Sequence, residues 1–90
     1  MLFTSEQVSN GHPDKICDQI SDAIVTDCLL NDRDSRVAVE CMIKDYDITI
    51  AGEITSSHTP DFKDLAYCVL AGIGLPNIEQ YTVNRLISKQ

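Results

Sequence analysis

The fold is decided by residues 36–55, which read RVAVECMIKDYDITIAGEIT. Apolar and polar side chains alternate in both halves of this stretch, and such alternation is typical of a β-strand with one buried face. The apolar positions are Val37, Val39, Cys41 and Ile43 in the first half and Ile48, Ile50 and Ile54 in the second. The stretch therefore predicts two strands, over residues 36–44 and 48–55, and a hairpin that turns at residues 44–47.

The register of the predicted hairpin follows from burial. Placing both apolar sets on one face pairs Ile43 with Ile48, whereas a slip by one residue would send one set to the opposite face. Such a slip would expose large apolar side chains at about 1.5–3 kcal/mol each, or bury two unpaired carboxylates. In the favoured register Glu40 and Glu53 share the polar face and lie diagonal to each other.

A first helix is predicted over residues 13–30, where apolar side chains recur at every fourth position. This spacing forms one apolar stripe along a helix. Its members are Ile16, Ile20, Ile24 and Cys28. Pro13 suits the first helical residue, because the N–H that proline lacks has no partner there in any case.

A second helix is predicted over residues 60–74. Thr59 is expected as its N-cap and Pro60 as its first residue. Gly74 is expected just beyond its end, because glycine readily adopts the left-handed conformation that closes many helices.

The remaining segments predict two further strands, over residues 2–8 and 81–88. The resulting order, β-α-β-β-α-β, is a split βαβ arrangement. We therefore expect one α+β domain over residues 1–90, with a mainly antiparallel sheet and two helices on one face.

Composition narrows the possible partners. The 90 residues carry 14 acidic and 7 basic side chains, a net charge of −7. Such a chain repels nucleic-acid phosphates, and no apolar run approaches the roughly 20 residues that cross a bilayer. We expect a cytoplasmic protein that binds neither nucleic acid nor membrane. The cysteines lack a zinc-binding spacing and are predicted to be reduced core residues; they are Cys17, Cys28, Cys41 and Cys68.

The residues best suited to chemistry lie in the stretch SNGHPDK, residues 9–15. His12 precedes the predicted helix and Asp14 lies in its first turn, where a histidine could contact a phosphate and an aspartate could hold Mg²⁺. The alternative is structural, with His12 capping the helix and Asp14 complementing its dipole. His58, before the second helix, is predicted to be a surface loop residue.

Four blocks of sequence make a family recognisable. They are LFTSE at residues 2–6, GHPDKICDQISDA at 11–23, RVA at 36–38 followed by Glu40, and AGEIT at 51–55. Together they closely resemble the opening of S-adenosylmethionine synthetase, tightly over residues 1–56 and loosely afterwards. The resemblance implies that this chain is the first of three similar βαββαβ domains, with the central and C-terminal domains absent.

The resemblance also implies a reaction, in which the sulfur of L-methionine attacks C5′ of ATP and displaces tripolyphosphate. Water then hydrolyses the tripolyphosphate to phosphate and pyrophosphate. By position, His12 is similar to the residue beside C5′ and the leaving oxygen. Asp14 is similar to a Mg²⁺ ligand and Glu6 to a second one, with two Mg²⁺ ions expected at each site.

The methionine side of the site is implied in the same way. Glu40 is similar to the ligand of K⁺, and Glu53 to the group that binds the methionine amino group. Gln90 is similar to a glutamine that contacts methionine. The family resemblance further implies a homo-oligomer, a dimer or tetramer with its sites between subunits.

Two departures from the family pattern affect these expectations. Asn10 replaces the usual glutamate, and residues 75–80 replace and shorten a usual segment. Because the family's phosphate-binding basic residues lie in later domains, we expect the isolated chain to be inactive. The alternative is a stand-alone binding or oligomerisation domain, or one chain of a split enzyme. Bare apolar surface would favour association with further domains, and a polar surface would favour independence.

Overall fold

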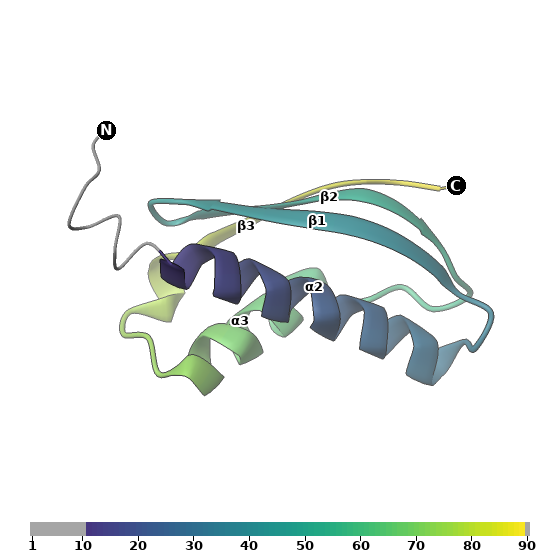
Figure 1. The fold of residues 1–90 in the computed structure, drawn as a ribbon, viewed down its shortest axis with the longest axis horizontal. Coiled ribbons are helices and arrows are strands. Elements are labelled where there is room, and N and C mark those ends of the chain that lie inside the picture. Colours follow the sequence, from purple (N-terminus) through teal and green to yellow (C-terminus); the bar gives the residue numbers. More distant parts are fainter. Residues whose placement is uncertain (1–10, 90) are drawn as a thin grey trace.

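The structure, a computed structural model, describes residues 11–89, and these form two layers (Figure 1). In chain order the elements are helix α2 (Gly11–Asn31), strands β1 (Arg36–Lys44) and β2 (Asp47–Thr55), helix α3 (Phe62–Ile73), the short 3-10 helix η1 (Ile78–Gln80) and strand β3 (Thr82–Ser88). Both helices lie on the same face of the sheet. The α+β class and the one-sided helical layer are confirmed, while the strand predicted over residues 2–8 lies outside the described residues.

The β1–β2 hairpin has the predicted register. The two strands are antiparallel, with Ile43 opposite Ile48. Pairing continues to Lys44 and Asp47, so the connection is shorter than the predicted turn at residues 44–47. Asp45 in this tight connection has a φ of 56°, in the left-handed region that aspartate tolerates better than most residues.

The described sheet is mixed, with the strand order β1-β2-β3. Strand β3 runs parallel to β2, with Ile48 beside Val83 and Ile50 beside Arg85. A parallel neighbour needs a long crossover, and helix α3 provides it. Among the described strands there is thus one antiparallel and one parallel pair, where the sequence suggested a mainly antiparallel sheet.

One hydrophobic core lies between the sheet and the two helices. Its fully or nearly fully buried members are Ile16, Ile20, Ile24 and Cys28 from α2, Ile48 and Ile50 from β2, and Phe62, Ala66 and Leu70 from α3. The predicted four-residue stripe of α2 is therefore the buried one. Within residues 11–89, neither helix is long and apolar enough to cross a membrane.

Both helices differ slightly from prediction at their beginnings. Helix α2 begins at Gly11, which still leaves Pro13 in the first turn, where a missing N–H costs no hydrogen bond. Helix α3 begins at Phe62, and the prediction of Thr59 as N-cap is wrong. The cap is Asp61, whose backbone is extended and whose carboxylate accepts the N–H of Asp64 at 3.0 Å. An aspartate caps a helix as well as a threonine, and this one stands nearer the first apolar residue.

The end of α3 follows the prediction. Gly74 has a φ of 93°, in the left-handed region. Its N–H donates to the carbonyls of Leu70 and Ala71, and the N–H of Leu75 also donates to Leu70. These bonds satisfy carbonyl groups that the helix end would otherwise leave without partners.

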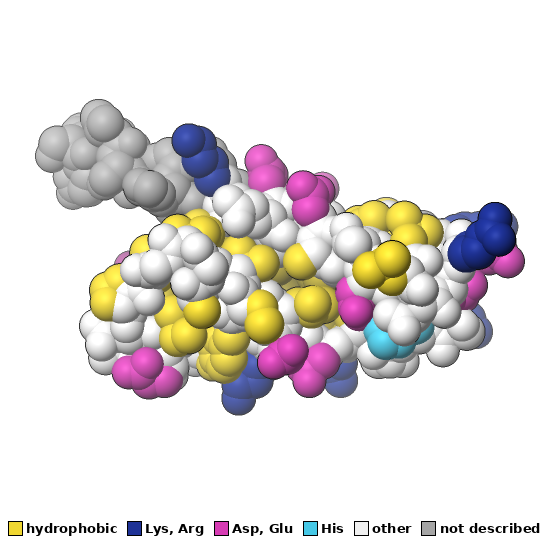
Figure 2. Space-filling model, turned by 90° about the horizontal axis from the view of Figure 1, so that it is seen from below, with side chains coloured by type: hydrophobic (Ala, Val, Ile, Leu, Met, Phe, Trp, Pro, Cys, Tyr) yellow, Lys and Arg dark blue, Asp and Glu magenta, His cyan; other side chains and the backbone are white. Residues whose placement is uncertain are grey.

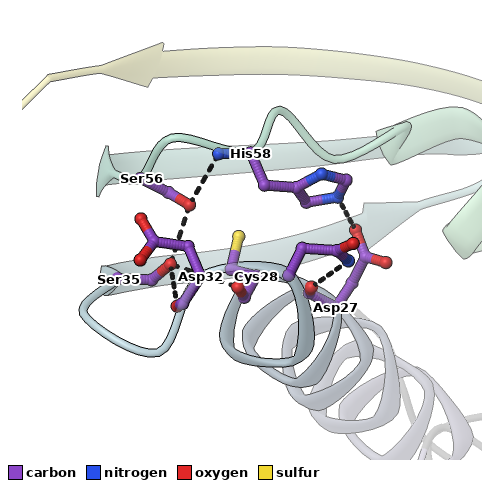
Figure 3. A network of polar contacts seen from close by, with 7 residues as sticks. Asp27, Cys28, Asp32, Ser35, Ser56 and His58 are labelled. Carbon is purple, nitrogen blue, oxygen red and sulfur yellow. Dashed lines mark hydrogen bonds and ion pairs between the residues drawn. The ribbon is translucent and has the colours of Figure 1, made fainter.

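A cluster of hydrogen bonds, here called the serine–aspartate clasp (Asp32, Ser35, Ser56 and Ser57), joins the end of α2 to the segment after β2. Figure 3 shows its Asp32, Ser35 and Ser56 members. The Ser35 hydroxyl lies 2.7 Å from the Ser56 hydroxyl. The Asp32 carboxylate accepts the backbone N–H of Ser57 at 2.8 Å and that of Asp34 at 3.0 Å. These bonds lower the pKa of Asp32 below its ordinary value, and the bond from the backbone N–H of Ser57 has the largest effect.

Gly52 is the position in the hairpin that tolerates only glycine. Its φ is 146°, and a Cβ added there would lie 2.1 Å from the carbonyl oxygen of Ala38 and 2.8 Å from the Cα of Val39. Both atoms belong to the backbone of β1 and have no room to move aside. Glycine is therefore required for β1 and β2 to approach each other here.

Replacing this glycine tests the close approach of the strands. We expect Gly52→Ala to lower the free energy of unfolding by about 2–4 kcal/mol, because backbone strain and overpacking add. Urea unfolding followed by circular dichroism measures the change. The matched control is Gly72→Ala in α3, where an added Cβ meets nothing within 4 Å. It should leave stability unchanged or raise it by up to about 1 kcal/mol, and equal effects of the two variants would contradict the assignment.

The clasp predicts a pH dependence. Because the folded-state pKa of Asp32 is lowered, its ionised form stabilises the fold above the ordinary carboxyl pKa, and that contribution is lost as pH falls below about 4. Asp32→Asn should therefore be less stable than the natural chain at pH 7, and the difference should shrink at pH 3. Thermal unfolding at both values measures it, with Asp34→Asn as control. A difference that is independent of pH would refute the role of the Asp32 charge.

Candidate functional site

The candidate site is the open face of the sheet, the side that the helices leave uncovered (Figure 1). Strand register and side-chain alternation assign to this face Ala38, Glu40 and Met42 from β1, Thr49, Ala51 and Glu53 from β2, and Asn84, Leu86 and Ser88 from β3. It combines acidic, apolar and small polar side chains, whereas the covered face is mainly apolar.

Glu40 and Glu53 lie together on the open face, as predicted. Glu40 is opposite Ala51 and Glu53 is opposite Ala38, so the two glutamates are diagonal neighbours on adjacent strands. Diagonal positions are separated by roughly 7–8 Å. Both side chains are exposed, and neither forms an ion pair within residues 11–89. Two solvated carboxylates on one surface present negative charge to a cationic ligand.

The apolar part of the open face was only partly foreseen from the sequence. Met42 is 65% exposed and Leu86 is 69% exposed. Leu86 lies beside Ala51, which in turn faces Glu40. The alternation of β3 could have located Leu86 on this face, but only the parallel pairing with β2 places it in the same row as Glu40.

Within the described residues, the structure places no other predicted site residue beside Glu40 and Glu53. Glu6 and Gln90 lie outside the described residues. His12 and Asp14 belong to the first turn of α2, and their side chains lie outside what the structure describes. Helix α2 lies on the covered side of the sheet and begins near the hairpin end (Figure 1).

Glu53 is also distant from the first turn of α2 along the direction of the strands. Glu53 lies seven residues beyond Tyr46, which is in the hairpin connection. At the rise of a β-strand this corresponds to about 23 Å. One copy of the described domain thus holds Glu53 far from the helix turn that contains His12 and Asp14.

The carboxylates of the open face do not form a complete metal site within the described residues. The carboxylate of Glu40 is a hard oxygen donor that points to solvent, the type of ligand that alkali and alkaline-earth cations take. No group of three or more metal-binding side chains occurs in the part of the chain that the structure describes. Glu40 could therefore supply at most one ligand to a cation from within the described residues.

His58 was predicted to be a surface loop residue. It does lie in the segment between β2 and α3, but its side chain has a defined partner there. Its Nε2 lies 2.7 Å from Oδ2 of Asp27 on α2, and both side chains are about 30% exposed (30% and 29%; Figure 3). The backbone N–H of His58 also donates to the Ser56 hydroxyl at 3.0 Å. His58 fastens the segment before α3 to helix α2, and the 310 Å³ pocket beside it is lined by Phe62, Arg85 and other residues of the covered side.

The helical side carries a second hollow, between α2 and α3. Figure 2 views this side and shows hydrophobic side chains gathered between acidic ones. The hollow is lined by apolar Leu30, Leu65 and Val69 together with Asp22 and Asp27. Gln19 and Thr26 also line the hollow, and Asp27 is already engaged by His58.

The four cysteines occupy three kinds of environment, and none of them forms a disulfide. Cys28 is buried as predicted, but Cys68 on α3 is exposed, so its prediction as a core residue is wrong. Cys17 and Cys41 are partly buried where α2 packs on β1. The pKa of Cys41 is raised to about 12. Burial is the largest cause, and a hydrogen bond with the Cys17 thiol is the second.

Comparison with known proteins relates this geometry to one family. The sequence profile of the S-adenosylmethionine synthetase N-terminal domain matches residues 1–90. The S-adenosylmethionine synthase of Mycoplasmopsis synoviae is 55% identical over 73 residues, which are 81% of this chain and 19% of that protein. The enzyme of the same name from Crocosphaera subtropica is 49% identical over 78 residues, 87% of this chain and 19% of that protein.

A solved structure agrees with the sequence comparison. The S-adenosylmethionine synthetase of Campylobacter jejuni matches with a TM-score of 0.83 and 32% identity, over 87% of this chain and 24% of that one. This chain thus spans about a fifth of the length of the relatives that it matches. It belongs to the S-adenosylmethionine synthetase family and corresponds to the N-terminal domain of that family.

Proposed function

We propose that this domain supplies the methionine- and K⁺-binding carboxylates of a methionine adenosyltransferase, which makes S-adenosylmethionine from ATP and L-methionine. The observation that carries the proposal is the placement of Glu40 and Glu53 on the open face, both exposed and neither in an ion pair within the described residues. A carboxylate facing an ammonium group forms a strong charge-assisted hydrogen bond. Glu53 takes this role toward the amino group of methionine, and Glu40 takes K⁺.

In the proposed reaction the methionine sulfur forms a bond to C5′ of ATP while the bond from C5′ to the triphosphate oxygen breaks. The thioether sulfur is already nucleophilic, so the step needs no general base. The protein contributes alignment and stabilisation of the charge that develops on the leaving oxygen. His12 donates to that oxygen, and Gln90 contacts methionine.

Water then splits the tripolyphosphate into phosphate and pyrophosphate. Asp14 and, with it, Glu6 hold Mg²⁺ when the ion is bound, and the ion supplies positive charge beside the phosphates. The carboxylates of this acidic domain would otherwise repel the polyphosphate. The central and C-terminal domains supply the basic residues that complete the ATP site.

We further propose that the complete enzyme is a cytoplasmic homo-oligomer with its sites between subunits. Two observations support this arrangement. One copy separates Glu53 from the first turn of α2, and a second copy would bring the two parts of the proposed site together. Met42 and Leu86 also leave apolar surface on the open face, and such surface is typical of association sites.

Activity measurements on two proteins test this proposal. The purified 90-residue chain, supplied with ATP, methionine, Mg²⁺ and K⁺, should form no S-adenosylmethionine. A chimera in which residues 1–90 replace the corresponding segment of the Mycoplasmopsis synoviae enzyme should form it. A folded but inactive chimera, beside an active parent enzyme, would support the alternative of a stand-alone binding domain. Activity of the 90-residue chain alone would show that the site needs no further domains.

The roles of the two glutamates can be separated in the same chimera. Glu53→Gln should raise the KM for methionine about 10- to 100-fold, because it removes the charge opposite the ammonium group. The KM for ATP should change much less. Glu40→Gln should instead blunt activation by K⁺. Glu79→Gln, an exposed charge removal in η1, serves as the control, and an unchanged methionine KM in Glu53→Gln would refute the role of Glu53.

A further inference from the structure

We propose that the covered side of the domain binds a small organic anion, a carboxylate attached to an apolar body, in the hollow between the start of α3 and strands β2 and β3. This site goes beyond the proposed function and does not depend on it, because Glu40 and Glu53 lie on the opposite, open face. Three features support it: a charged side chain in an apolar row, its lack of an acidic partner within residues 11–89, and a hollow beside it.

Arg85 interrupts an apolar row on the covered face of β3. It lies beside Ile50 of β2, which is fully buried, so the Arg85 side chain leaves the sheet on the side of the helices. Its neighbours on the same face of β3, Val83 and Ile87, are both packed against the core. Alternation predicts an apolar side chain at this position, and the chain has a guanidinium group there instead.

The guanidinium of Arg85 lies over an aromatic ring and pairs with no carboxylate of the described residues. Its Cζ is 5.6 Å from the ring centroid of Phe62, a side chain that is 5% exposed. Such a cation–π contact holds the charge at a defined place. Within residues 11–89 the one ion pair joins His58 to Asp27. No acidic group of the described domain therefore uses the N–H donors of Arg85, although the chain has 14 acidic and 7 basic side chains.

A hollow opens beside this guanidinium. It consists of two adjoining pockets of 310 and 470 Å³, the first of which is also lined by apolar Ile54 and Ile87. The residues that line both pockets are Thr59, Pro60, Phe62 and Arg85. These volumes are in the range of small-molecule sites, which combine apolar walls with a few polar groups that fix the ligand. The hollow thus suits a ligand with one anionic group and an apolar body.

Two further charged side chains line the second pocket, and together they leave the preference for an anion in place. Lys63 contributes a positive charge at the start of α3. Asp61 contributes a negative one, but its carboxylate accepts the N–H of Asp64 as the cap of that helix. The charge of Asp61 is thus partly balanced by the helix end that it caps.

His58 lines the first pocket, and its ring is held by another contact. Its Nε2 lies 2.7 Å from Oδ2 of Asp27, which directs that nitrogen toward α2. Arg85 is therefore the group that meets the anion, and its planar fork can donate two parallel N–H bonds to the two oxygens of a carboxylate. A carboxylate carries one charge, which one guanidinium balances. A free phosphate would carry more charge and would leave the apolar walls unused.

A titration of the 15N-labelled 90-residue chain with 3-phenylpropionate, followed by two-dimensional NMR, tests this site. The probe has one carboxylate and a planar apolar ring. We expect saturable shifts of backbone amide signals, concentrated at residues 54–63 and 83–87. The neutral amide of the same shape, 3-phenylpropanamide, should bind at least about tenfold more weakly, because it lacks the charge that faces Arg85.

The same titration defines the results that would overturn the proposal. Equal affinity for the acid and its amide would show that the guanidinium does not recognise the ligand. Inorganic phosphate that binds as tightly as the acid would show that the apolar walls contribute nothing. Shifts that do not saturate, or that centre on other residues, would show that the hollow is not the site.

A pair of arginine variants locates the charge that is recognised. Arg85→Gln should weaken binding of 3-phenylpropionate about 10- to 100-fold, because a charge-assisted hydrogen bond is lost. Arg36→Gln, which removes an exposed arginine at the start of β1, is the matched control and should leave the affinity unchanged. Unchanged affinity in Arg85→Gln would overturn the proposal. The comparison of acid with amide uses the natural chain, so it stays decisive if a variant fails to fold.

Discussion

The rest of this structure depends on the one-sided burial of the β1–β2 hairpin. Ile48 and Ile50 have no solvent exposure, and the alternation of a strand then commits every other residue of β2 to the opposite face. Pairing Ile43 with Ile48 extends the same division to β1. A single constraint thus separates a covered apolar face, which forms the core with both helices, from an open face that holds Glu40 and Glu53.

Several contacts toward the end of the hairpin away from its turn secure this division. Gly52 allows β2 to approach the backbone of Ala38 more closely than any side chain would permit. The serine–aspartate clasp joins the end of α2 to the segment after β2, and His58 binds Asp27 beside it. These contacts hold the helical layer against the sheet without using any side chain of the open face. The contacts that stabilise the fold and the carboxylates that we propose to bind ligands therefore lie on different sides of one sheet.

The two faces also divide the residues of the proposed site. Glu40 and Glu53, to which we assign K⁺ and the methionine amino group, lie on the open face, while the turn containing His12 and Asp14 begins the helix on the covered side. The proposed site therefore needs another surface to bring both groups to one substrate, and exposed Met42 and Leu86 show that the open face has apolar area to offer it. The membership of a family whose relatives are about five times longer agrees with this requirement.

The sequence alone determined the local features, because periodicity and burial depend on neighbouring residues. It predicted the hairpin register, the buried stripe of α2, the left-handed Gly74 and the shared face of Glu40 and Glu53. It misplaced the cap of α3, since Thr59 and Asp61 are both good caps and only packing of Phe62 selects between them. The parallel pairing of β3, the partnership of His58 with Asp27, and the contact of Cys17 with Cys41 were decided by the tertiary structure. Each of them joins segments far apart in the chain, and no local pattern encodes which distant surfaces meet.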